Sequence, residues 1–219
     1  MIQAAEIAAT RDMNRIYRYQ RHIYDLTRRC FLLGRDRLLD ELAPPKGGSV
    51  LEVGCGTGRN LIQAARRYPD ATFYGFDVSD QMLATAASAI TRRGLTSRIR
   101  LAQADAATFD AGRTFGRPGF DRVFISYALS MIPPRREAMT RAIENMAAGG
   151  SLHIVDFGRQ DDLPVWFRTV LFAWLRQFSV HPIDTLRTDL HALAERHGAT
   201  LRFAPLYRGY ASYAVIEKS

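Results

Sequence analysis

Short apolar runs alternate with amphipathic segments from residue 49 to the end of the chain, and glycine or proline residues separate many of them. The apolar runs predict buried strands, and the amphipathic segments predict helices. We expect strands over 49–53, 72–76, 99–103, 121–126, 151–156, 201–207 and 211–217. We expect helices over 59–68, 80–92, 184–196 and from 135 to 147, the last one stopped by Gly149 and Gly150.

The alternation of strand and helix predicts an α/β fold with a mostly parallel sheet and helices on both faces. The last two strands flank Arg208 and Gly209, which predicts a hairpin and therefore one antiparallel strand. Pro205 favours an edge position or a bulge for the first of the two. A proline- and glycine-rich break near residue 47 divides the chain into a helical lid or acceptor-binding segment, 1–47, and a core, 48–219.

Three glycines follow the first predicted strand, at Gly54, Gly56 and Gly58, and a helix comes next. Glycine allows backbone N–H groups to approach a ligand closely at the start of a helix. Asp77 ends the second predicted strand, at the spacing expected of a carboxylate that binds ribose hydroxyls. A nicotinamide dinucleotide site is disfavoured, because its third glycine would stand where this chain has Arg59.

These motifs resemble the class I S-adenosylmethionine-dependent methyltransferases over about residues 45–219. The resemblance implies a seven-stranded Rossmann-like sheet with S-adenosylmethionine as cofactor. It implies that Glu52 orients the cofactor's ammonium, that the glycines lie along its methionine part and that Asp77 binds its ribose. It also places Asp105 at the adenine amino group and the backbone N–H of Ala106 at the ring.

Further cofactor contacts are expected from Cys55, Val78, Met82 and Ser126. Two of the assignments have structural alternatives. Asp77, followed by Ser79 and Asp80, could serve turn and cap chemistry, and Met82 could pack in the core. Two cysteines, Cys30 and Cys55, have no metal-binding spacing, so we expect no metal.

The methyl acceptor is indicated by other segments. The fourth strand is not followed by Asn-Pro-Pro-Tyr or Asp-Pro-Pro-Tyr, which favours a small-molecule or lipid acceptor over a planar base. Residues 17–36 and 155–182 are similar to bacterial betaine-lipid N-methyltransferases, which methylate the amine of diacylglyceryl-homoserine three times. The alternatives are a phosphatidylethanolamine N-methyltransferase, a quinone methyltransferase, an RNA methyltransferase and a non-catalytic cofactor-binding protein.

Several residues are candidates for the acceptor site. Tyrosine faces can hold a partly methylated cation, His22 could act as a base or a structural hydrogen-bonding group, and arginine suits a carboxylate. The catalytic candidates are Tyr17, His22, Tyr24 and Tyr127. The substrate-binding candidates are Tyr19, Arg28, Arg35 and Asp156. We expect residues 1–47 to close over the site when cofactor binds.

The chain of 219 residues has a net charge of +8, and nearly all of its positive charge is arginine. A basic protein favours anionic partners. Aromatic residues are interleaved with arginines over 166–178, which suits a membrane interface; a lid helix packing its aromatics on the sheet is the alternative. With no apolar run of about 18 residues, we expect a cytoplasmic protein on the inner face of an anionic membrane, with no nucleic-acid partner.

Overall fold

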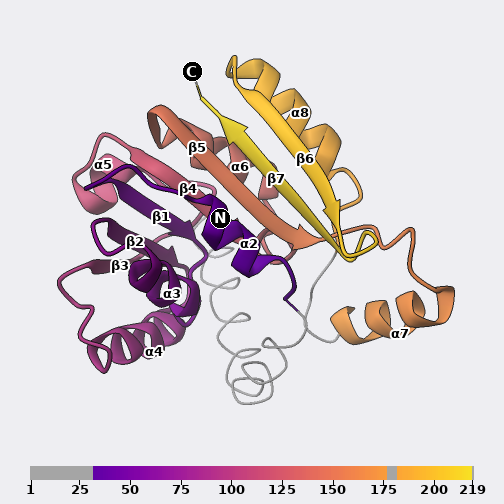
Figure 1. Ribbon diagram of the computed structural model, residues 1–219, viewed down its shortest axis with the longest axis horizontal. Helices are drawn as coiled ribbons and strands as arrows, with labels where there is room; N and C mark the ends of the chain where they lie inside the picture. The colour runs from indigo at the N-terminus through magenta and orange to yellow at the C-terminus, as the bar shows by residue number, and fades with distance from the viewer. Residues whose placement is uncertain (1–31, 177–181, 219) are drawn as a thin grey trace, which may run out of the picture.

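The structure is a computed structural model that describes residues 32–176 and 182–218, without the side chains of Trp174 and Arg176 (Figure 1). A seven-stranded sheet forms its centre in the order β3-β2-β1-β4-β5-β7-β6. The strands are β1 Ser49–Val53, β2 Thr72–Asp77, β3 Ile99–Gln103, β4 Phe120–Ser126, β5 Met146–Phe157, β6 Thr200–Leu206 and β7 Ala211–Glu217. Strand β7 runs antiparallel to both β5 and β6, and the other pairs are parallel.

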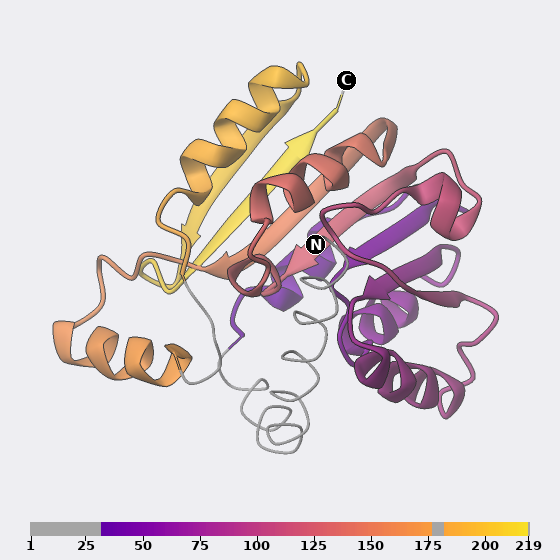
Figure 2. The ribbon, with the colours of Figure 1, turned by 180° about the vertical axis from the view of Figure 1, so that it is seen from behind.

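Helices cover both faces of the sheet, as Figures 1 and 2 show. Residues of α2, α3, α4 and α7 share one core cluster, whereas residues of α5, α6 and α8 share the other. The bounds are α2 Arg35–Glu41, α3 Arg59–Arg67, α4 Asp80–Thr91, α5 Ala111–Phe115, α6 Arg135–Glu144, α7 Val165–Arg176 and α8 Leu186–Arg196, with a 3₁₀ turn at Leu129–Met131. The predicted α/β architecture is therefore confirmed.

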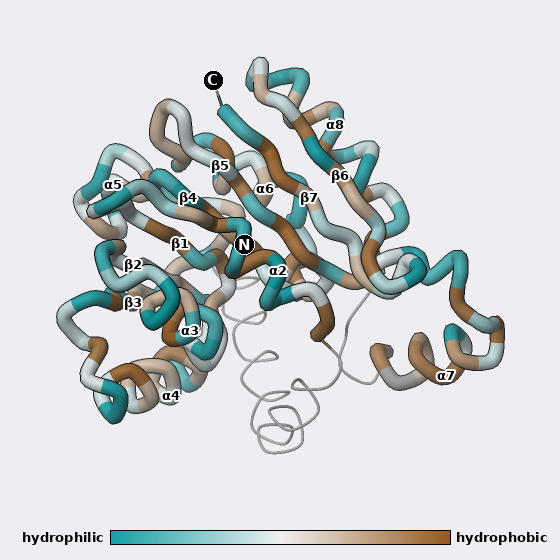
Figure 3. Tube along the Cα trace, viewed as in Figure 1, coloured by the Kyte–Doolittle hydropathy of each residue, from teal (hydrophilic) through white to brown (hydrophobic). Residues whose placement is uncertain are grey.

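Side-chain burial explains why the sheet forms here. All five residues of β1 are buried, as expected for a central parallel strand covered on both faces. The hydropathy colouring of Figure 3 shows hydrophobic stretches along the central strands. Strand β6 pairs only with β7, so Pro205 lies on an edge strand, as predicted.

The expected end of helix α6 was wrong. We expected it to reach residue 147 and to stop at Gly149 and Gly150, but it ends at Glu144. Asn145 ends it: its Nδ2 donates to the carbonyl oxygen of Arg141 at 2.8 Å, and its Oδ1 accepts from the N–H of Ala111 at 2.6 Å. The glycines instead lie within the long strand β5.

Helix α2 belongs to the packed core, although it falls within the segment predicted as a lid. Leu38 and Leu39 on this helix, with Leu42 after it, are buried in the same cluster as residues of α3. Residues 1–31 of the helical cap expected over residues 1–47 lie outside the described residues, and the division at residue 47 remains a prediction.

The strand order determines where a ligand site is expected. Strand β1 lies between β2 and β4: β2 and β3 are added on one side of it and β4 and β5 on the other, so the strand order reverses at β1. In open parallel sheets, ligands bind beyond the carboxyl ends of the strands at such a switch point. The glycine loop follows β1 at that point.

Candidate active site

The glycine loop requires its glycines. Gly54, Gly56 and Gly58 have φ angles of 67°, 51° and 71°, in the left-handed region that favours glycine. A Cβ atom on Gly54 would lie 2.9 Å from Cβ of Ala128, and one on Gly58 would lie 3.0 Å from Cβ of Ala86. The loop therefore brings its backbone close to β4 and α4 while turning the chain into α3.

Asp77 holds the glycine loop from the end of β2. Its Oδ2 accepts from the N–H of Gly56 at 2.8 Å, and its Oδ1 accepts from the N–H of Ser79 at 3.0 Å. Each carboxylate oxygen has two lone pairs, so these bonds leave acceptor capacity for ribose hydroxyls. The turn chemistry considered as an alternative is present, and it is compatible with the predicted ribose contact.

A pocket opens between the glycine loop, the end of β4 and the start of α2. The empty space within it is ≈ 400 Å³, a volume that includes space open to solvent. The lining residues are Leu32, Arg35, Glu52, Gly54, Cys55, Thr57, Arg59, Asn60 and Ser126.

The polar groups of this pocket fit an amino acid. Glu52 accepts a hydrogen bond from Asn60 Nδ2 at 2.8 Å, so a buried carboxylate is held at a fixed place. Asn60 Oδ1 and Ser126 Oγ are buried, and neither has a hydrogen-bond partner among the described residues. Buried polar atoms are normally satisfied, so these acceptors suit a ligand that brings donors, such as an ammonium group.

The positive side of the pocket comes from α3 and α2. Gly58 is the N-cap of α3 and makes no side-chain cap hydrogen bond, so no capping side chain occupies the first-turn N–H groups of α3 beside the loop. Arg59 is the first residue of this helix. Arg35 lines the pocket from α2, and its Nε donates to the carbonyl oxygen of Leu32 at 3.0 Å. The pocket is thus lined by one carboxylate, Glu52, and by two arginines.

The predicted cofactor residues divide into two groups. Glu52, Gly54, Cys55 and Ser126 line the pocket, together with Arg35, which was predicted for the acceptor. Gly56, Gly58, Asp77, Val78, Met82, Asp105 and Ala106 are not among its lining residues. Leu32, Thr57, Arg59 and Asn60 were missed. For Arg59 and Asn60 the signal was present, because the first turn of a helix after a glycine loop faces the ligand.

The adenine side shows local contacts. Asp105 is exposed, and its Oδ1 accepts from the N–H of Ala107 at 2.7 Å. The carbonyl oxygen of Val78 accepts from Gln103 Nε2 at 3.0 Å, which ties the loop after β2 to the end of β3. Met82 is buried on α4, where Ser79 caps the helix as expected. The adenine assignments of Asp105 and Ala106 stay predictions.

Two predicted acceptor residues are buried at the ends of β4 and β5. The hydroxyl of Tyr127 donates to the carbonyl oxygen of Leu33 at 2.6 Å, and burial raises the pKa of this hydroxyl well above its usual value. Asp156 accepts from the N–H groups of Ser130 and Phe157, and burial raises its pKa to about 6. In this structure both side chains anchor backbone.

The other acceptor candidates, Tyr17, Tyr19, His22, Tyr24 and Arg28, lie outside the described residues. Cys55 is buried, which raises the pKa of its thiol well above the usual value and keeps it protonated. Residues 32–176 and 182–218 contain no group of three His, Cys, Asp or Glu side chains that could hold a metal ion. None of the helices described is both long and apolar enough to span a bilayer.

Comparison with known proteins agrees with this geometry. Residues 50–150 match the family model described as a methyltransferase domain. A nocamycin O-methyltransferase from Saccharothrix syringae is 36% identical over 99 residues, which cover 44% of this chain and 33% of that protein. A phosphatidylethanolamine N-methyltransferase from Cereibacter sphaeroides is 32% identical over 120 residues, covering 55% and 56%. The chain therefore spans only about a third to a little over half of these relatives.

A solved structure shares the fold. Phosphoethanolamine N-methyltransferase 2 of Haemonchus contortus, in complex with S-adenosyl-L-methionine, superposes with a TM-score of 0.62 at 22% identity, covering 78% of this chain and 38% of that one. Residues 50–150 thus match a methyltransferase domain, and the sheet order and the glycine loop are those expected of the class I methyltransferase fold. S-adenosylmethionine is the cofactor of this class.

Proposed function

We propose that the protein is an S-adenosylmethionine-dependent N-methyltransferase that converts the amine of diacylglyceryl-homoserine stepwise to a trimethyl betaine headgroup. The observation that carries the proposal is the pocket, which is lined by Glu52 with its hydrogen-bonded partner Asn60 and by two arginines, Arg35 and Arg59. The cofactor and the proposed acceptor each carry both an amine and a carboxylate. The site must therefore hold two zwitterionic groups close together.

The cofactor assignment follows the polarity of the pocket. Glu52 binds the ammonium of its methionine part, and the first turn of α3 with Arg59 binds the carboxylate. Asp77 binds the ribose hydroxyls, while Val78, Met82, Asp105 and Ala106 surround the adenine. When bound, S-adenosylmethionine supplies an electrophilic methyl group on a sulfonium.

Arg35 is the residue assigned to the acceptor carboxylate. It stands on α2, and a guanidinium binds a carboxylate in bidentate fashion. The acceptor amine must be deprotonated before it can react, and each methyl group replaces one proton, which leaves to solvent. Holding the neutral amine in place and excluding water supply most of the rate.

The choice of an amine acceptor has two supports. One is the similarity of residues 17–36 and 155–182 to betaine-lipid N-methyltransferases. The other is the phosphatidylethanolamine N-methyltransferase among the relatives, although the nocamycin relative is an O-methyltransferase. We further propose that the protein works in the cytoplasm at an anionic membrane, in keeping with its net charge of +8.

The test is mass spectrometry of lipids after incubation of the purified protein with S-adenosylmethionine and diacylglyceryl-homoserine in mixed micelles. We expect stepwise gains of one, two and three methyl groups, which are absent with Asp77→Ala. An unchanged lipid, with cofactor binding intact by calorimetry, would overturn the acceptor assignment.

Phosphatidylethanolamine is the second candidate acceptor, because a relative 32% identical carries that name. A parallel incubation with this lipid separates the two. Methylation of phosphatidylethanolamine alone would move the function to that lipid. In that case Arg35 would contact a phosphate instead of a carboxylate, and Arg35→Lys would retain more activity, since lysine binds phosphate as a point charge.

A further inference from the structure

The exposed large hydrophobic side chains of the described residues gather at one edge of the molecule. They are Leu33 (37% exposed), Val165 (70%), Trp166 (70%), Val170 (63%) and Tyr207 (54%). Val165 begins the helix that follows β5, and Tyr207 directly follows β6. Both strands end at the same edge, because both run antiparallel to β7.

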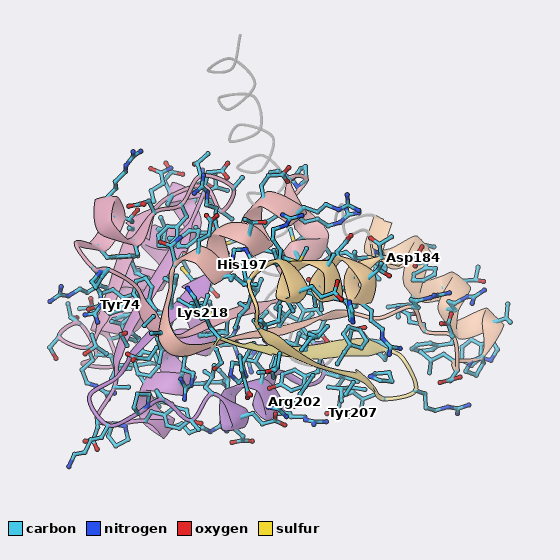
Figure 4. All side chains as sticks on the ribbon, turned by 90° about the horizontal axis from the view of Figure 1, so that it is seen from above. Tyr74, Asp184, His197, Arg202, Tyr207 and Lys218 are labelled. Atoms are coloured by element: carbon cyan, nitrogen blue, oxygen red, sulfur yellow. The ribbon has the colours of Figure 1, made fainter. Side chains whose placement is uncertain are left out.

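Leu33 lies near Tyr207, and the turn that begins at Tyr207 is bonded to the segment that leads into α7. A Cβ atom built on Gly34, next to Leu33, would lie 2.9 Å from Leu206 and 3.8 Å from Tyr207. At the other end of the same turn, the N–H of Gln160 donates to the carbonyl oxygen of Gly209 at 2.8 Å, and α7 begins five residues later. In Figure 4, Tyr207 lies at the α7 end of the hairpin, far from Lys218. We call the five exposed residues the carboxyl-edge surface.

Helix α7 has two apolar sides. Leu171 and Leu175 are buried in a core cluster, and Phe167 and Phe172 pack against it. Val165, Trp166 and Val170 face solvent, so this helix carries apolar side chains that its packing against the core does not bury. Figures 1 and 3 show this helix beyond the end of the sheet, with hydrophobic residues along much of its length. An exposed apolar patch of this kind marks an interaction site.

The carboxyl-edge surface adjoins the pocket. Leu32 lines the pocket and Leu33 is exposed, so one dipeptide contributes to both. Tyr127, which follows the pocket residue Ser126, donates its hydroxyl hydrogen bond to the carbonyl oxygen of Leu33. A partner that covers this surface would therefore lie at the pocket opening.

Charge identifies the partner. Residues 159–176 and 207–208 contain four arginines, Arg159, Arg168, Arg176 and Arg208, and two aspartates, Asp161 and Asp162. The whole chain has a net charge of +8. Asp161 pairs with Arg159 at 3.2 Å. Tryptophan and aliphatic side chains with arginines around them match the interface of an anionic bilayer, where rings lie at headgroup level.

We infer that the carboxyl-edge surface docks on an anionic lipid bilayer, with Trp166 and Val170 inserted among the headgroups, so that the pocket faces the membrane. This inference rests on the proposed function, since it lets a lipid headgroup reach the pocket while its acyl chains stay in the bilayer. Docking then brings substrate to the site without extracting the lipid.

The test is sedimentation of the full chain with vesicles of phosphatidylcholine alone and of phosphatidylcholine with 30 mol% phosphatidylglycerol. We expect binding to the anionic vesicles that weakens with salt. Trp166→Glu/Val170→Glu should weaken binding at least about tenfold, because two charges would enter the interface. The matched control is Thr188→Glu/Ala192→Glu, at the same spacing on exposed positions of α8, and it should bind as the native chain does.

Fluorescence supplies a second readout that does not depend on a damaging substitution. The chain has two tryptophans, so Trp174→Phe leaves Trp166 as the only one. Its emission should shift to the blue when anionic vesicles are added. An unshifted emission, or equal binding by the Trp166→Glu/Val170→Glu chain and its control, would overturn the inference.

Other occupants give different results. If a second copy covers the surface, light scattering will show a dimer that Trp166→Glu/Val170→Glu converts to a monomer, without vesicle binding, and the inference fails. Vesicle binding without methylation of any lipid would support the surface and overturn the proposed acceptor. Methylation in micelles without vesicle binding would support the acceptor and overturn the surface.

Discussion

The two halves of the sheet are specified by different kinds of interaction. In the half formed by β1 to β3, backbone geometry dominates: glycines at positive φ and the Asp77 carboxylate hold the loop that follows β1. In the half formed by β4 to β7, buried side chains such as Tyr127 and Asp156 anchor segments to one another. The family match over residues 50–150 contains the first half and ends within β5.

From this difference we expect cofactor binding to depend on the first half of the sheet and acceptor specificity to depend on the second. A loop made of backbone can be shared by enzymes with many acceptors, which agrees with relatives as different as an O-methyltransferase and a phospholipid N-methyltransferase. We propose that acceptor binding depends on particular side chains and on the helices that follow β5. Substitutions in the two halves should therefore affect different measurements.

The largest effect is expected in the first half, from Asp77→Ala. Its two bonds to backbone N–H groups involve a charged acceptor, worth about 1.5–3 kcal/mol each, and the proposed ribose contact is lost as well. Affinity for S-adenosylhomocysteine, measured by calorimetry, should fall at least about 100-fold. Asp77→Asn retains one acceptor oxygen, so its affinity for S-adenosylhomocysteine should lie between those of the native chain and of Asp77→Ala.

Asp70→Ala is the matched control, because Asp70 is an exposed aspartate in the turn before β2. It should bind as the native chain does. If Asp77→Ala and Asp77→Asn both fold and bind cofactor with native affinity, the loop does not depend on this carboxylate. The distinction drawn between the two halves of the sheet would then be wrong.

The next effect concerns the pH dependence of stability in the second half. Burial lowers the pKa of His153 from 6.5 to about 4, so the unfolded chain binds this proton more readily and acid is destabilising between these values. Burial raises the pKa of Asp156 from 3.8 to about 6, so the folded chain retains this proton and rising pH is destabilising over nearly the same window.

The two contributions oppose one another, and single substitutions should reveal each. In Asp156→Asn, lowering the pH from 6.5 to 4 should reduce the free energy of unfolding by about 3 kcal/mol relative to the native profile. In His153→Gln, raising the pH from 4 to 6 should reduce it by a similar amount relative to the native profile. Urea unfolding at half-unit pH steps measures both, and three parallel profiles would contradict the assignments.

A smaller effect is expected from Glu52→Gln, which preserves shape and removes the charge proposed to bind the cofactor's ammonium. Affinity for S-adenosylmethionine should drop about tenfold, or about 1.4 kcal/mol. Glu144→Gln changes an exposed glutamate at the end of α6 and serves as the control. Equal affinities in the two variants would exclude a role for the Glu52 charge.

The smallest effect is expected from Tyr127→Phe. Loss of the hydrogen bond to Leu33 should lower the free energy of unfolding by about 1 kcal/mol. The kcat should fall several-fold while cofactor affinity is unchanged, because Leu33 is tied to the pocket side of α2. Tyr74→Phe, which loses a bond to Arg117 in the other half, should leave kcat unchanged; a parallel loss in both variants would argue against a local role.

The halves also differ in how far the sequence predicts them. The glycine loop, the strands and the place of Asp77 are local patterns, so they could be read from spacing. The end of α6 could not, because Asn145 bonds to Ala111, a residue 34 positions away. The position of Arg35 beside Glu52 and Ser126 likewise depends on how α2 packs against the core.

Asn60 is an intermediate case. Its bond to Glu52 spans eight residues and follows from the start of α3 directly after the glycine loop. Counting from the predicted helix start would have found it. The exposed side of α7 has no such signal, since its aromatic residues suit a packed lid and a membrane surface equally well.

We propose that the protein transfers methyl groups to the nitrogen of a lipid headgroup at this pocket. It is tested most directly with S-adenosylmethionine labelled as CD₃, diacylglyceryl-homoserine in anionic vesicles, and tandem mass spectrometry of the product. We predict up to three CD₃ groups on the headgroup nitrogen and none elsewhere. Label on an oxygen or a carbon, or a lipid without label while the protein binds both cofactor and vesicles, would contradict the account.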